Sequence, residues 1–530
     1  MARKGPFKGR TVAVVNDLGA DEQLYLYRKA RELKEAALAG RDLSAFRLDE
    51  RDYQVYLIFM EDSTRTRESF RNAAEFLGSR VNVFDAATSS FNKNESIADT
   101  VKMLSGYASD SAFVIRSKLE GVCRALEGVI GSYADQSGRP RPAFVNAGDG
   151  KHEHPTQEFL DEFSFLEQLE WKRDRIHLAL TGDLYHGRTV HSKVDGLSVF
   201  KEVEVDLVAP ELLGMPAHYV ERMRRKGYEV RVFESLDEYL AQKKVAPIWY
   251  FTRLQLERMG DAVLERADSL RGDLTFRRDM LGKLPEGARF YHPLPRDRAK
   301  PTNPTFLDEL PLNGWDAQSA NGYWTRIVLL GMLSGLLGSD FDGAARPIEG
   351  FDEDFVAEAP VSEHPAREYK VGIKPVEEGI VIDHVASGRP IDEIWSNIDA
   401  ARRILGLNVR SSHGVFHNNR GSFKGIISLP DVTSFGERDL KKLAAIAPGC
   451  TLNLVRGGRV VKKYRLAMPP RIYAFDEISC KNPNCVSAPA HQEGLSPEFL
   501  RKTPAAGEAS TTFVCKYCER EHAFREIWDV

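Results

Sequence analysis

The sequence predicts an α/β fold of two doubly wound parallel-sheet domains, followed by a small α+β domain and a C-terminal zinc-ribbon-like domain. Three observations support this prediction. Short apolar runs alternate with amphipathic stretches up to residue 338, the alternation stops in an acidic Gly- and Pro-containing segment, and four cysteines gather near the C-terminus. The 530 residues are enough for three or four domains with their own cores.

Ten runs before residue 338 have the composition of strands: 11–15, 55–60, 81–84, 112–115, 143–146, 176–181, 204–208, 229–233, 247–251 and 289–291. Buried parallel strands read as short, nearly continuous apolar runs. Ten strands are too many for one comfortable sheet, so we expect one domain over residues 1–150 and another over 151–323. A helix over 158–170 bridges them, and a helix over 324–338 returns to the first domain.

The pattern changes after residue 338. Residues 339–368 have no sustained period and are interpreted as a solvated linker. Residues 369–470 combine short strands (380–382, 425–428 and 451–455) with one helix over 391–405, which indicates a small α+β domain. Residues 471–530 hold the cysteine cluster.

Composition excludes several classes of protein. With 42% hydrophobic and 28% charged residues the chain is of ordinary globular type, and its net charge of −4 offers no bulk electrostatic case for binding nucleic acid. The apolar run behind the basic N-terminal residues is too short for a signal peptide. The longest apolar stretch, 327–337, falls short of the ~20 residues that span a bilayer. We therefore expect a cytoplasmic protein without membrane contact.

A polar turn follows the second predicted strand and contains Ser63, Thr64, Arg65 and Thr66. Hydroxyl groups, a guanidinium fork and the free N–H groups of a helix start suit a phosphate dianion. The alternative is a helix N-cap with solvated arginines.

A second group, His154 and Gln157, comes soon after the strand 143–146. Strand carboxyl ends are where open α/β sheets bind ligands, and residues three apart at a helix start can face one crevice. The imidazole can donate to a carbonyl oxygen while the amide binds the neighbouring nitrogen. A metal on His152 and His154 is the weaker alternative, because no third ligand stands at helical spacing.

Three later loops also follow strands. Arg188 lies in a glycine-containing loop that does not match a dinucleotide fingerprint, and Arg253 with Gln255 suits a carboxylate. In the His-Pro-Leu-Pro-Arg loop at 292–296, prolines stiffen the backbone and expose the carbonyls of Pro293 and Leu294. Each loop alone is equally compatible with a structural role.

Taken in order, Ser-Thr-Arg-Thr-Arg at 63–67, Arg116, His-Pro-Thr-Gln at 154–157 and the three later loops resemble the transcarbamoylases, specifically aspartate carbamoyltransferase, over residues 7–338. The resemblance implies a carbamoyl phosphate site of Ser63, Thr64, Arg65, Thr66, Arg116, His154 and Gln157. It also implies aspartate ligands Lys93, Arg188, Arg253 and Gln255, carbonyl contacts from Pro293 and Leu294, and catalytic roles for Arg65, Thr66, Lys93, Arg116 and His154.

The resemblance further implies that Ser89 and Lys93 belong to a loop that a neighbouring subunit inserts into the site. A catalytic trimer would then be the smallest active unit. Asn94 stands where the family has a glycine. Ornithine enzymes carry a cysteine in the last loop, where this chain has residues 292–294. In addition, Arg188, Arg253 and Gln255 offer two cations and an amide to a dicarboxylate. Both features favour aspartate over ornithine. No cofactor is expected for catalysis.

The four clustered cysteines form two pairs, Cys480 with Cys485 and Cys515 with Cys518. Four thiolates at this spacing predict one structural, tetrahedral Zn²⁺ per chain. Two disulfides are the alternative, which a cytoplasmic location disfavours, and a nucleic-acid-binding zinc ribbon is another.

Residues 378–384, 406–408 and 515–519 resemble the separate regulatory chain of enteric-type aspartate carbamoyltransferases, which pairs a nucleotide-binding allosteric domain with a zinc domain. The resemblance implies a nucleotide effector such as CTP, ATP or UTP. Glu377, Glu378 and Gly458 depart from the family pattern, and Arg420 stands where a lysine is usual. The positions that correspond to the nucleotide site are Asp383, His384, Arg420, Lys424, Asn453 and Lys463.

The predicted function is aspartate carbamoyltransferase in pyrimidine synthesis, with the regulatory chain fused behind the catalytic chain. Two alternatives are a transcarbamoylase for another amine and a catalytically silent nucleotide-sensing subunit. The complete set of site residues speaks against the silent subunit.

Overall fold

The computed structural model describes residues 5–48, 53–85, 95–255, 267–346, 354–361, 376–418, 421–502 and 511–529. The chain divides into two compact units, Met1–Pro347 and Ile348–Val530. Within the described residues, no helix combines the length and the apolar character needed to cross a bilayer.

The first unit contains a four-stranded parallel sheet in the order β2-β1-β3-β4 and a five-stranded parallel sheet in the order β7-β6-β5-β8-β9. The strands are β1 Tyr53–Phe59, β2 Arg80–Asp85, β3 Asp110–Ser117, β4 Ala143–Asp149, β5 Arg175–Thr181, β6 Glu202–Val208, β7 Glu229–Phe233, β8 Ile248–Phe251 and β9 Arg289–Tyr291. The helices are α1 Ala20–Leu38, α2 Thr64–Leu77, α3 Ile97–Ser105, α4 Val122–Ser137, α5 Pro155–Gln168, α6 Arg188–Gly196, α7 Ala217–Arg225, α8 Leu236–Leu240, α10 Ala267–Leu274 and α11 Trp315–Ser334.

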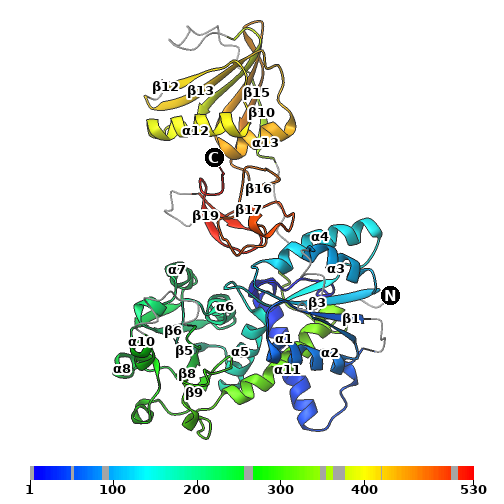
Figure 1. Cartoon of the computed structure of the whole chain (residues 1–530), viewed down its shortest axis with the longest axis vertical. Helices are drawn as coiled ribbons and strands as arrows, with labels where there is room; N and C mark the ends of the chain where they lie inside the picture. The colour runs from blue at the N-terminus through cyan, green and yellow to red at the C-terminus, as the bar shows by residue number, and fades with distance from the viewer. Residues whose placement is uncertain are drawn as a thin grey trace. The chain divides into compact units, whose positions relative to one another are not determined.

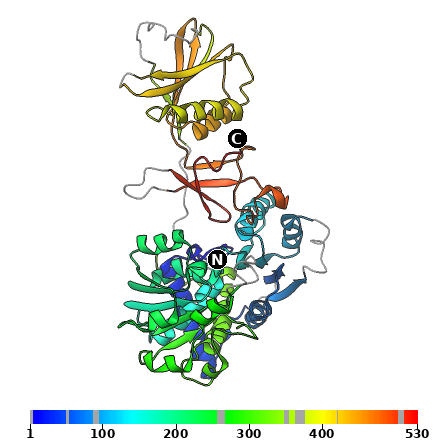
Figure 2. The same ribbon diagram turned by 60° about the vertical axis from the view of Figure 1, so that its left-hand side comes forward.

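Both sheets are covered on two faces, as doubly wound folds require (Figures 1 and 2). In the first sheet, Val55 and Val114 join the core beneath α2 and α11, while Tyr56 and Phe113 stack on the opposite face. In the second sheet, alternate residues enter two separate cores. The predicted α/β class is confirmed.

The predicted strand 11–15 is wrong. Only Val12 forms an isolated parallel bridge, to Val145, and a 3-10 turn begins at Val15. Buried Asp17 ends the run, because its carboxylate accepts from the backbone N–H groups of Ala13 and Val14. The hydrogen bonds of the Asp17 side chain therefore stabilise a turn where the apolar run predicted a strand.

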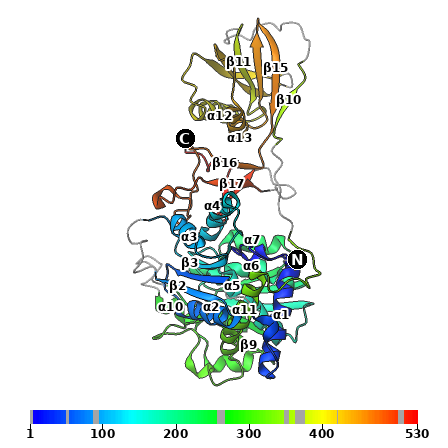
Figure 3. The same ribbon diagram turned by 90° about the vertical axis from the view of Figure 1, so that its right-hand side faces the viewer.

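The second unit begins with a six-stranded antiparallel sheet in the order β10-β15-β14-β11-β13-β12. Helices α12 Ile391–Ile404 and α13 Glu437–Ile446 lie together on one side of this sheet (Figure 3). Its strands are β10 Val356–Ala359, β11 Gly379–Val385, β12 Ser412–His417, β13 Phe423–Pro430, β14 Thr451–Arg456 and β15 Arg459–Leu466. The small α+β domain is confirmed, but it contains a second helix, α13, that the sequence analysis did not identify.

The segment interpreted as a linker is partly structured. Phe341 packs against the rings of Phe7 and Tyr25, and Arg346 donates to Asp17 Oδ1 at 2.7 Å. Farther along, β10 pairs antiparallel with β15 at the edge of the six-stranded sheet. A solvated linker over all of 339–368 is therefore wrong for these two stretches, since residues outside the segment hold them.

A second, four-stranded antiparallel sheet completes the chain, in the order β16-β17-β18-β19. Its strands are β16 Arg471–Tyr473, β17 Glu498–Arg501, β18 Thr512–Cys515 and β19 Glu521–Ala523. The four clustered cysteines are buried beside it.

Candidate functional site

The turn after β1 leaves its donors available to a ligand. Helix α2 begins at Thr64, and Ser63 occupies the N-cap position in extended backbone without a side-chain capping bond. Its hydroxyl therefore stands beside the free N–H groups of the first helical turn instead of satisfying one of them. Helix N-termini favour anions, so this turn is suited to a phosphate.

The ends of β3 and β4 position two arginines. Arg116 Nη1 donates to the carbonyl of Ala147 at 3.1 Å, and Arg188 Nη1 donates to the carbonyl of Gly150 at 2.9 Å. Between these acceptors, Gly148 has φ +111°, and a Cβ there would lie 2.9 Å from Arg116 Nη1 and 3.1 Å from Arg188 Cζ. Only glycine lets both guanidinium groups approach the strand end so closely.

Glu61 joins these two arginines. Its Oε2 lies 3.0 Å from Arg116 Nη2 and 3.3 Å from Arg188 Nη2. One carboxylate thus bridges a predicted phosphate ligand and a predicted aspartate ligand. Glu61 lies two residues before the Ser-Thr-Arg-Thr-Arg motif at 63–67, but no sequence pattern distinguishes it from solvated acidic residues.

His154 and Gln157 are buried at the start of α5. Burial lowers the pKa of His154 well below its ordinary value, and the neighbouring charges of Arg188, Arg116 and Arg326 lower it further. The ring is therefore neutral near pH 7. Thr156 Oγ1 lies 3.4 Å from His154 Nδ1, an arrangement that suits a proton on Nε2.

The remaining predicted ligands lie on two loops of the five-stranded sheet. Gln255 Nε2 donates to the carbonyl of His186 at 3.3 Å, which fixes the strand end beside Arg253. In the 292–296 loop, the N–H of Leu294 donates to His292 Nδ1 at 2.7 Å. Burial, followed by nearby Arg296, Arg65 and Arg253, lowers the pKa of His292 to about 3, so this ring is also neutral.

These residues surround one cavity of about 900 Å³ in the first unit. Every described residue predicted for the catalytic site lines it: Ser63, Thr64, Arg65, Thr66, Arg116, His154, Gln157, Arg188, Arg253, Gln255, Pro293 and Leu294. Ser89 and Lys93 lie outside the described residues. The cavity also contains Glu61, Gln318 and Arg326, which the sequence analysis missed. Gln318 lies in the first turns of α11, where the apolar pattern did not reveal the helix.

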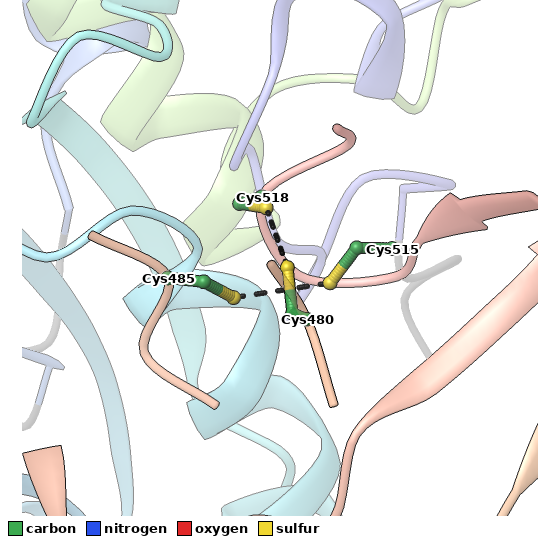
Figure 4. Close-up of side chains that lie close together, drawn as sticks. All are labelled: Cys480, Cys485, Cys515 and Cys518. Carbon is green, nitrogen blue, oxygen red and sulfur yellow. Dashed lines mark hydrogen bonds between the residues drawn. The ribbon is translucent and has the colours of Figure 1, made fainter. Parts of the chain in front are cut away.

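The four cysteines of the second unit converge on one point (Figure 4). All four sulfur atoms lie within 4.8 Å of one another, with Cys480 and Cys518 at 3.7 Å and Cys485 and Cys515 at 3.8 Å. A tetrahedron of thiolates about 2.3 Å from a central ion has edges of about 3.8 Å. The cluster therefore fits a four-coordinate metal, and the disulfide alternative is wrong because all four cysteines are free.

The predicted nucleotide residues lie on the six-stranded sheet. Asn453 on β14 is in register with Val381 on β11 and with Lys463 on β15, and Asp383 follows Val381 by two residues. The two-residue period of a strand puts these polar residues on the same face. Lys424 on β13 reaches Asp383, with Nζ 2.6 Å from Oδ1.

His384 stands in the irregular stretch of β11 between Asp383 and Val385, with φ +64°. Arg420 lies outside the described residues. The structure therefore brings four of the six predicted positions together, namely Asp383, Lys424, Asn453 and Lys463, with His384 adjacent along the chain.

Three family models match the chain. Residues 10–167 match "Aspartate/ornithine carbamoyltransferase, carbamoyl-P binding domain", residues 371–467 match "Aspartate carbamoyltransferase regulatory chain, allosteric domain", and residues 470–528 match "Aspartate carbamoyltransferase regulatory chain, metal binding domain". Protein PyrBI of Thermotoga maritima is 53% identical over 99% of this chain and 100% of its own length. The chain belongs to the aspartate carbamoyltransferase family.

Members similar to it include Protein PyrBI of Treponema denticola, which is 47% identical over 98% of both chains. Aspartate transcarbamoylase of Trypanosoma cruzi, solved with N-(phosphonacetyl)-L-aspartic acid, is 29% identical with a TM-score of 0.53, over 62% of this chain and 97% of that one. The catalytic subunit from M. jannaschii is 32% identical with a TM-score of 0.52, over 61% and 97%. The chain described here is therefore a carbamoyltransferase whose catalytic part is fused to a metal-binding regulatory part.

Proposed function

We propose that the chain transfers the carbamoyl group of carbamoyl phosphate to the α-amine of L-aspartate, giving N-carbamoyl-L-aspartate and phosphate, in de novo pyrimidine synthesis. The observation that carries this proposal is the single cavity in which a helix N-terminus, several arginines and a neutral histidine meet. The Trypanosoma cruzi enzyme, 28% identical with a TM-score of 0.52 over 62% of this chain and 96% of its own, was solved with carbamoyl phosphate and aspartate.

In this proposal the phosphate of carbamoyl phosphate binds at the start of α2. Ser63, Thr64 and Thr66 donate hydroxyl and backbone hydrogen bonds, while Arg65 and Arg116 neutralise the dianion. Charge-assisted bonds of this kind strengthen as charge moves onto the leaving oxygen, so they favour the transition state over the bound substrate.

His154 and Gln157 bind the carbamoyl group. Because its ring is neutral, His154 donates one hydrogen bond to the carbonyl oxygen without bringing another full charge beside Arg116. The amide oxygen of Gln157 accepts from the carbamoyl NH₂ group. The carbonyls of Pro293 and Leu294 supply further acceptors for the same nitrogen and for the incoming amine.

Arg188, Arg253 and Gln255 bind the two carboxylates of aspartate. Arg188 must then exchange its bond to Glu61 for one to the substrate. The amine nitrogen attacks the carbamoyl carbon, the bond from that carbon to the phosphate oxygen breaks, and the departing phosphate takes the proton that the amine loses. No cofactor takes part in this sequence, and orientation of the two substrates supplies much of the acceleration.

A single assay tests the reaction. Labelled carbamoyl phosphate is incubated with the full chain and either aspartate or ornithine, and the labelled product is identified. Product with aspartate alone supports the proposal. Product only with ornithine, or no product with either amine, contradicts it.

We also propose that Ser89 and Lys93 complete the site of a neighbouring subunit, so that the enzyme is built on catalytic trimers. The variants Lys93→Ala and Arg65→Ala should each be inactive alone. Mixing them should restore part of the activity, because some sites in a mixed trimer receive both intact residues. Absence of rescue in mixtures that exchange subunits would contradict a shared site.

We propose Zn²⁺ as the ion held by Cys480, Cys485, Cys515 and Cys518. Thiolate ligands suit zinc, and Ser487 Oγ lies 3.2 Å from Cys485 Sγ while His522 Nε2 lies 3.5 Å from Cys480 Sγ, as outer partners of bound thiolates do. Free thiols at metal-ligand spacing also support a cytoplasmic location. Metal analysis should find one zinc per chain.

We propose that CTP, ATP or UTP binds the polar face that carries Asp383, Lys424, Asn453 and Lys463, with His384 and Arg420 beside it. A base amine would donate to Asp383, and Lys424 and Lys463 would meet the triphosphate. The assay above, repeated with each nucleotide, should show a changed rate. We also propose domains over 1–150, 151–323, 369–470 and 471–530, with the C-terminal part of α11 returning to the first domain and with 339–368, which the structure shows to be partly structured, between the second and the third.

A further inference from the structure

A buried carboxylate connects the two ends of the cavity in the first unit. Asp161 lies on α5 one turn after Gln157 and is fully buried. Its Oδ1 accepts from Gln157 Nε2 at 2.8 Å and from Gln318 Nε2 at 2.6 Å. Its Oδ2 accepts from Lys193 Nζ at 2.9 Å. Three donors from α5, α11 and α6 therefore share one carboxyl group.

This sharing decides which way the amide of Gln157 points. A carboxylate only accepts hydrogen bonds, so the NH₂ group of Gln157 must face Asp161. The amide oxygen of Gln157 is then the atom left for a ligand in the cavity. An oxygen at this place accepts from the NH₂ group of a carbamoyl ligand, whereas the reversed amide would oppose one donor with another.

The same carboxylate fixes the second amide. Gln318 gives its NH₂ group to Asp161, and its Oε1 accepts from the backbone N–H of His292 at 2.9 Å. His292 begins the loop that carries the Pro293 and Leu294 carbonyls. Asp161 thus holds the helix that bears Gln157 and, through Gln318, the loop on the opposite side of the carbamoyl group.

The ammonium group of Lys193 compensates the negative charge of this buried carboxylate. Its ammonium is fully buried on α6, 2.9 Å from Asp161 Oδ2 and 2.9 Å from Glu158 Oε2, with the Tyr250 ring centroid at 4.1 Å. A buried carboxylate without a cation would be strongly disfavoured. Glu158 shares the lysine with Asp161 but is not hydrogen-bonded to Gln157 or Gln318, which makes it a matched control.

We propose that Asp161 is a positioning residue that makes the site selective for a carbamoyl over an acyl group, by holding the Gln157 oxygen toward the NH₂ of the ligand. The inference rests on the proposed function, because it assumes that the carbamoyl group lies beside Gln157. Acetyl phosphate is the matched probe, since it replaces the NH₂ of carbamoyl phosphate by a methyl group of similar size.

The test compares the dissociation constants of carbamoyl phosphate and acetyl phosphate for the full chain without aspartate. In Asp161→Asn, the side-chain NH₂ can face Gln157 and reverse its amide. The preference for carbamoyl phosphate should then fall about tenfold, the effect of one hydrogen bond of about average strength. Glu158→Gln, which also removes one acid beside Lys193, should keep the preference of the wild type.

A double-variant comparison separates positioning from general damage. Gln157→Ala should lower the preference by a similar factor, and adding Asp161→Asn to it should lower the preference no further. If Asp161→Asn does not fold, Asp161→Asn with Lys193→Met is compared with Glu158→Gln with Lys193→Met, since both pairs remove the lysine and one acid.

The inference is overturned if Asp161→Asn keeps the wild-type preference, if it weakens both ligands by the same factor, or if Glu158→Gln lowers the preference equally. Failure of the proposed function looks different. In that case the wild-type chain itself forms no N-carbamoyl-L-aspartate, whereas an active wild type with an unaltered preference in Asp161→Asn rejects only the role of Asp161.

Discussion

The cavity of the first unit and the polar sheet face of the second use charge in opposite ways. Within the described residues, seven arginines and four acids line the cavity, so its lining carries more positive than negative charge. On the sheet face, the main acid and base, Asp383 and Lys424, pair with each other. The first arrangement keeps an excess of positive charge for anions although Glu61 bridges two of its arginines, whereas the acid and base of the second offset each other.

Removing the metal should give the largest difference in folding between the two units, because only the second unit holds the cysteine cluster. Cys518→Ser breaks the four-thiolate site, and structural zinc contributes on the order of 10 kcal/mol to the folding of small metal domains. We expect loss of bound zinc and of the folded C-terminal sheet, while unit 1 keeps its secondary structure. Metal analysis and circular dichroism measure both.

The matched control is Cys450→Ala, which removes a buried thiol outside the cluster and should keep one zinc per chain. Zinc retained in Cys518→Ser would show that the cluster is not the metal site.

Truncating a cavity arginine should have the next largest effect. Arg65→Ala removes a cation at the phosphate end, and loss of such a transition-state contact lowers kcat by about 10²–10³. Arg67→Ala is the control, because Arg67 lies on the same helix but does not line the cavity and is 3.6 Å from Glu68. Steady-state kinetics with equal losses for both variants would contradict the assigned site.

Gly148→Ala tests how closely the strand end must approach the arginines. A Cβ would displace Arg116 and Arg188, and a misplacement near 1 Å costs about 10² in rate. Gly138→Ala is the control for backbone strain alone, because Gly138 has φ +67° and nothing within 4 Å of its added Cβ. Similar kcat/KM values for the two variants would rule out displacement as the cause.

Lys424→Met tests the ion pair of the sheet face. Loss of one cation from the proposed triphosphate site should weaken CTP binding about tenfold and leave the rate without nucleotide unchanged. Lys462→Met is the control, since Lys462 pairs with Glu358 and is a neighbour of Lys463 in sequence. Calorimetric titration in which both variants bind like the wild type would exclude Lys424 from the site.

The last prediction concerns the pH dependence of stability, which does not alter a ligand contact. Burial raises the pKa of Glu158 from its usual 4.5 to about 7, so its contribution to stability is complete below pH 4.5 and is lost as pH rises through 7. Glu158→Gln removes this titration, so its stability should fall less than that of the wild type between pH 5 and 8. Denaturant unfolding at both pH values measures the difference, and parallel losses would contradict it.

The fold was predictable where one physical signal dominated. Strands β7 and β9, the two edge strands of their sheet, agree with their predicted ranges, because short runs rich in Val, Phe and Tyr favour strands. The run at 11–15 has the same composition, yet Asp17 turns it through contacts that no local pattern reveals. Helix α11 begins at Trp315, nine residues before its predicted start, since its first turns are polar and are buried by tertiary packing.

The site was predictable as a set of motifs but not as a network. Arg65, His154 and Arg188 lie at helix starts that follow strands, where their residue types indicate ligand binding. Asp161 and Gln318 sit within helices, where an acid and an amide are ordinary, and their importance comes only from the hydrogen bonds that join them. The partner of a buried polar group is a long-range property, which a single sequence does not record.

The bridge from Glu61 to Arg116 and Arg188 affects which cellular anions can occupy the cavity. A cavity rich in arginine would attract chloride, sulfate and unrelated metabolites as readily as its substrates. Because Glu61 already bridges two of these cations and offsets one of their two charges, a weak monoanion gains less by entering. Only a ligand with several negative groups at the right separation can replace the internal carboxylate, so the resting protein carries its own counter-ion as a filter.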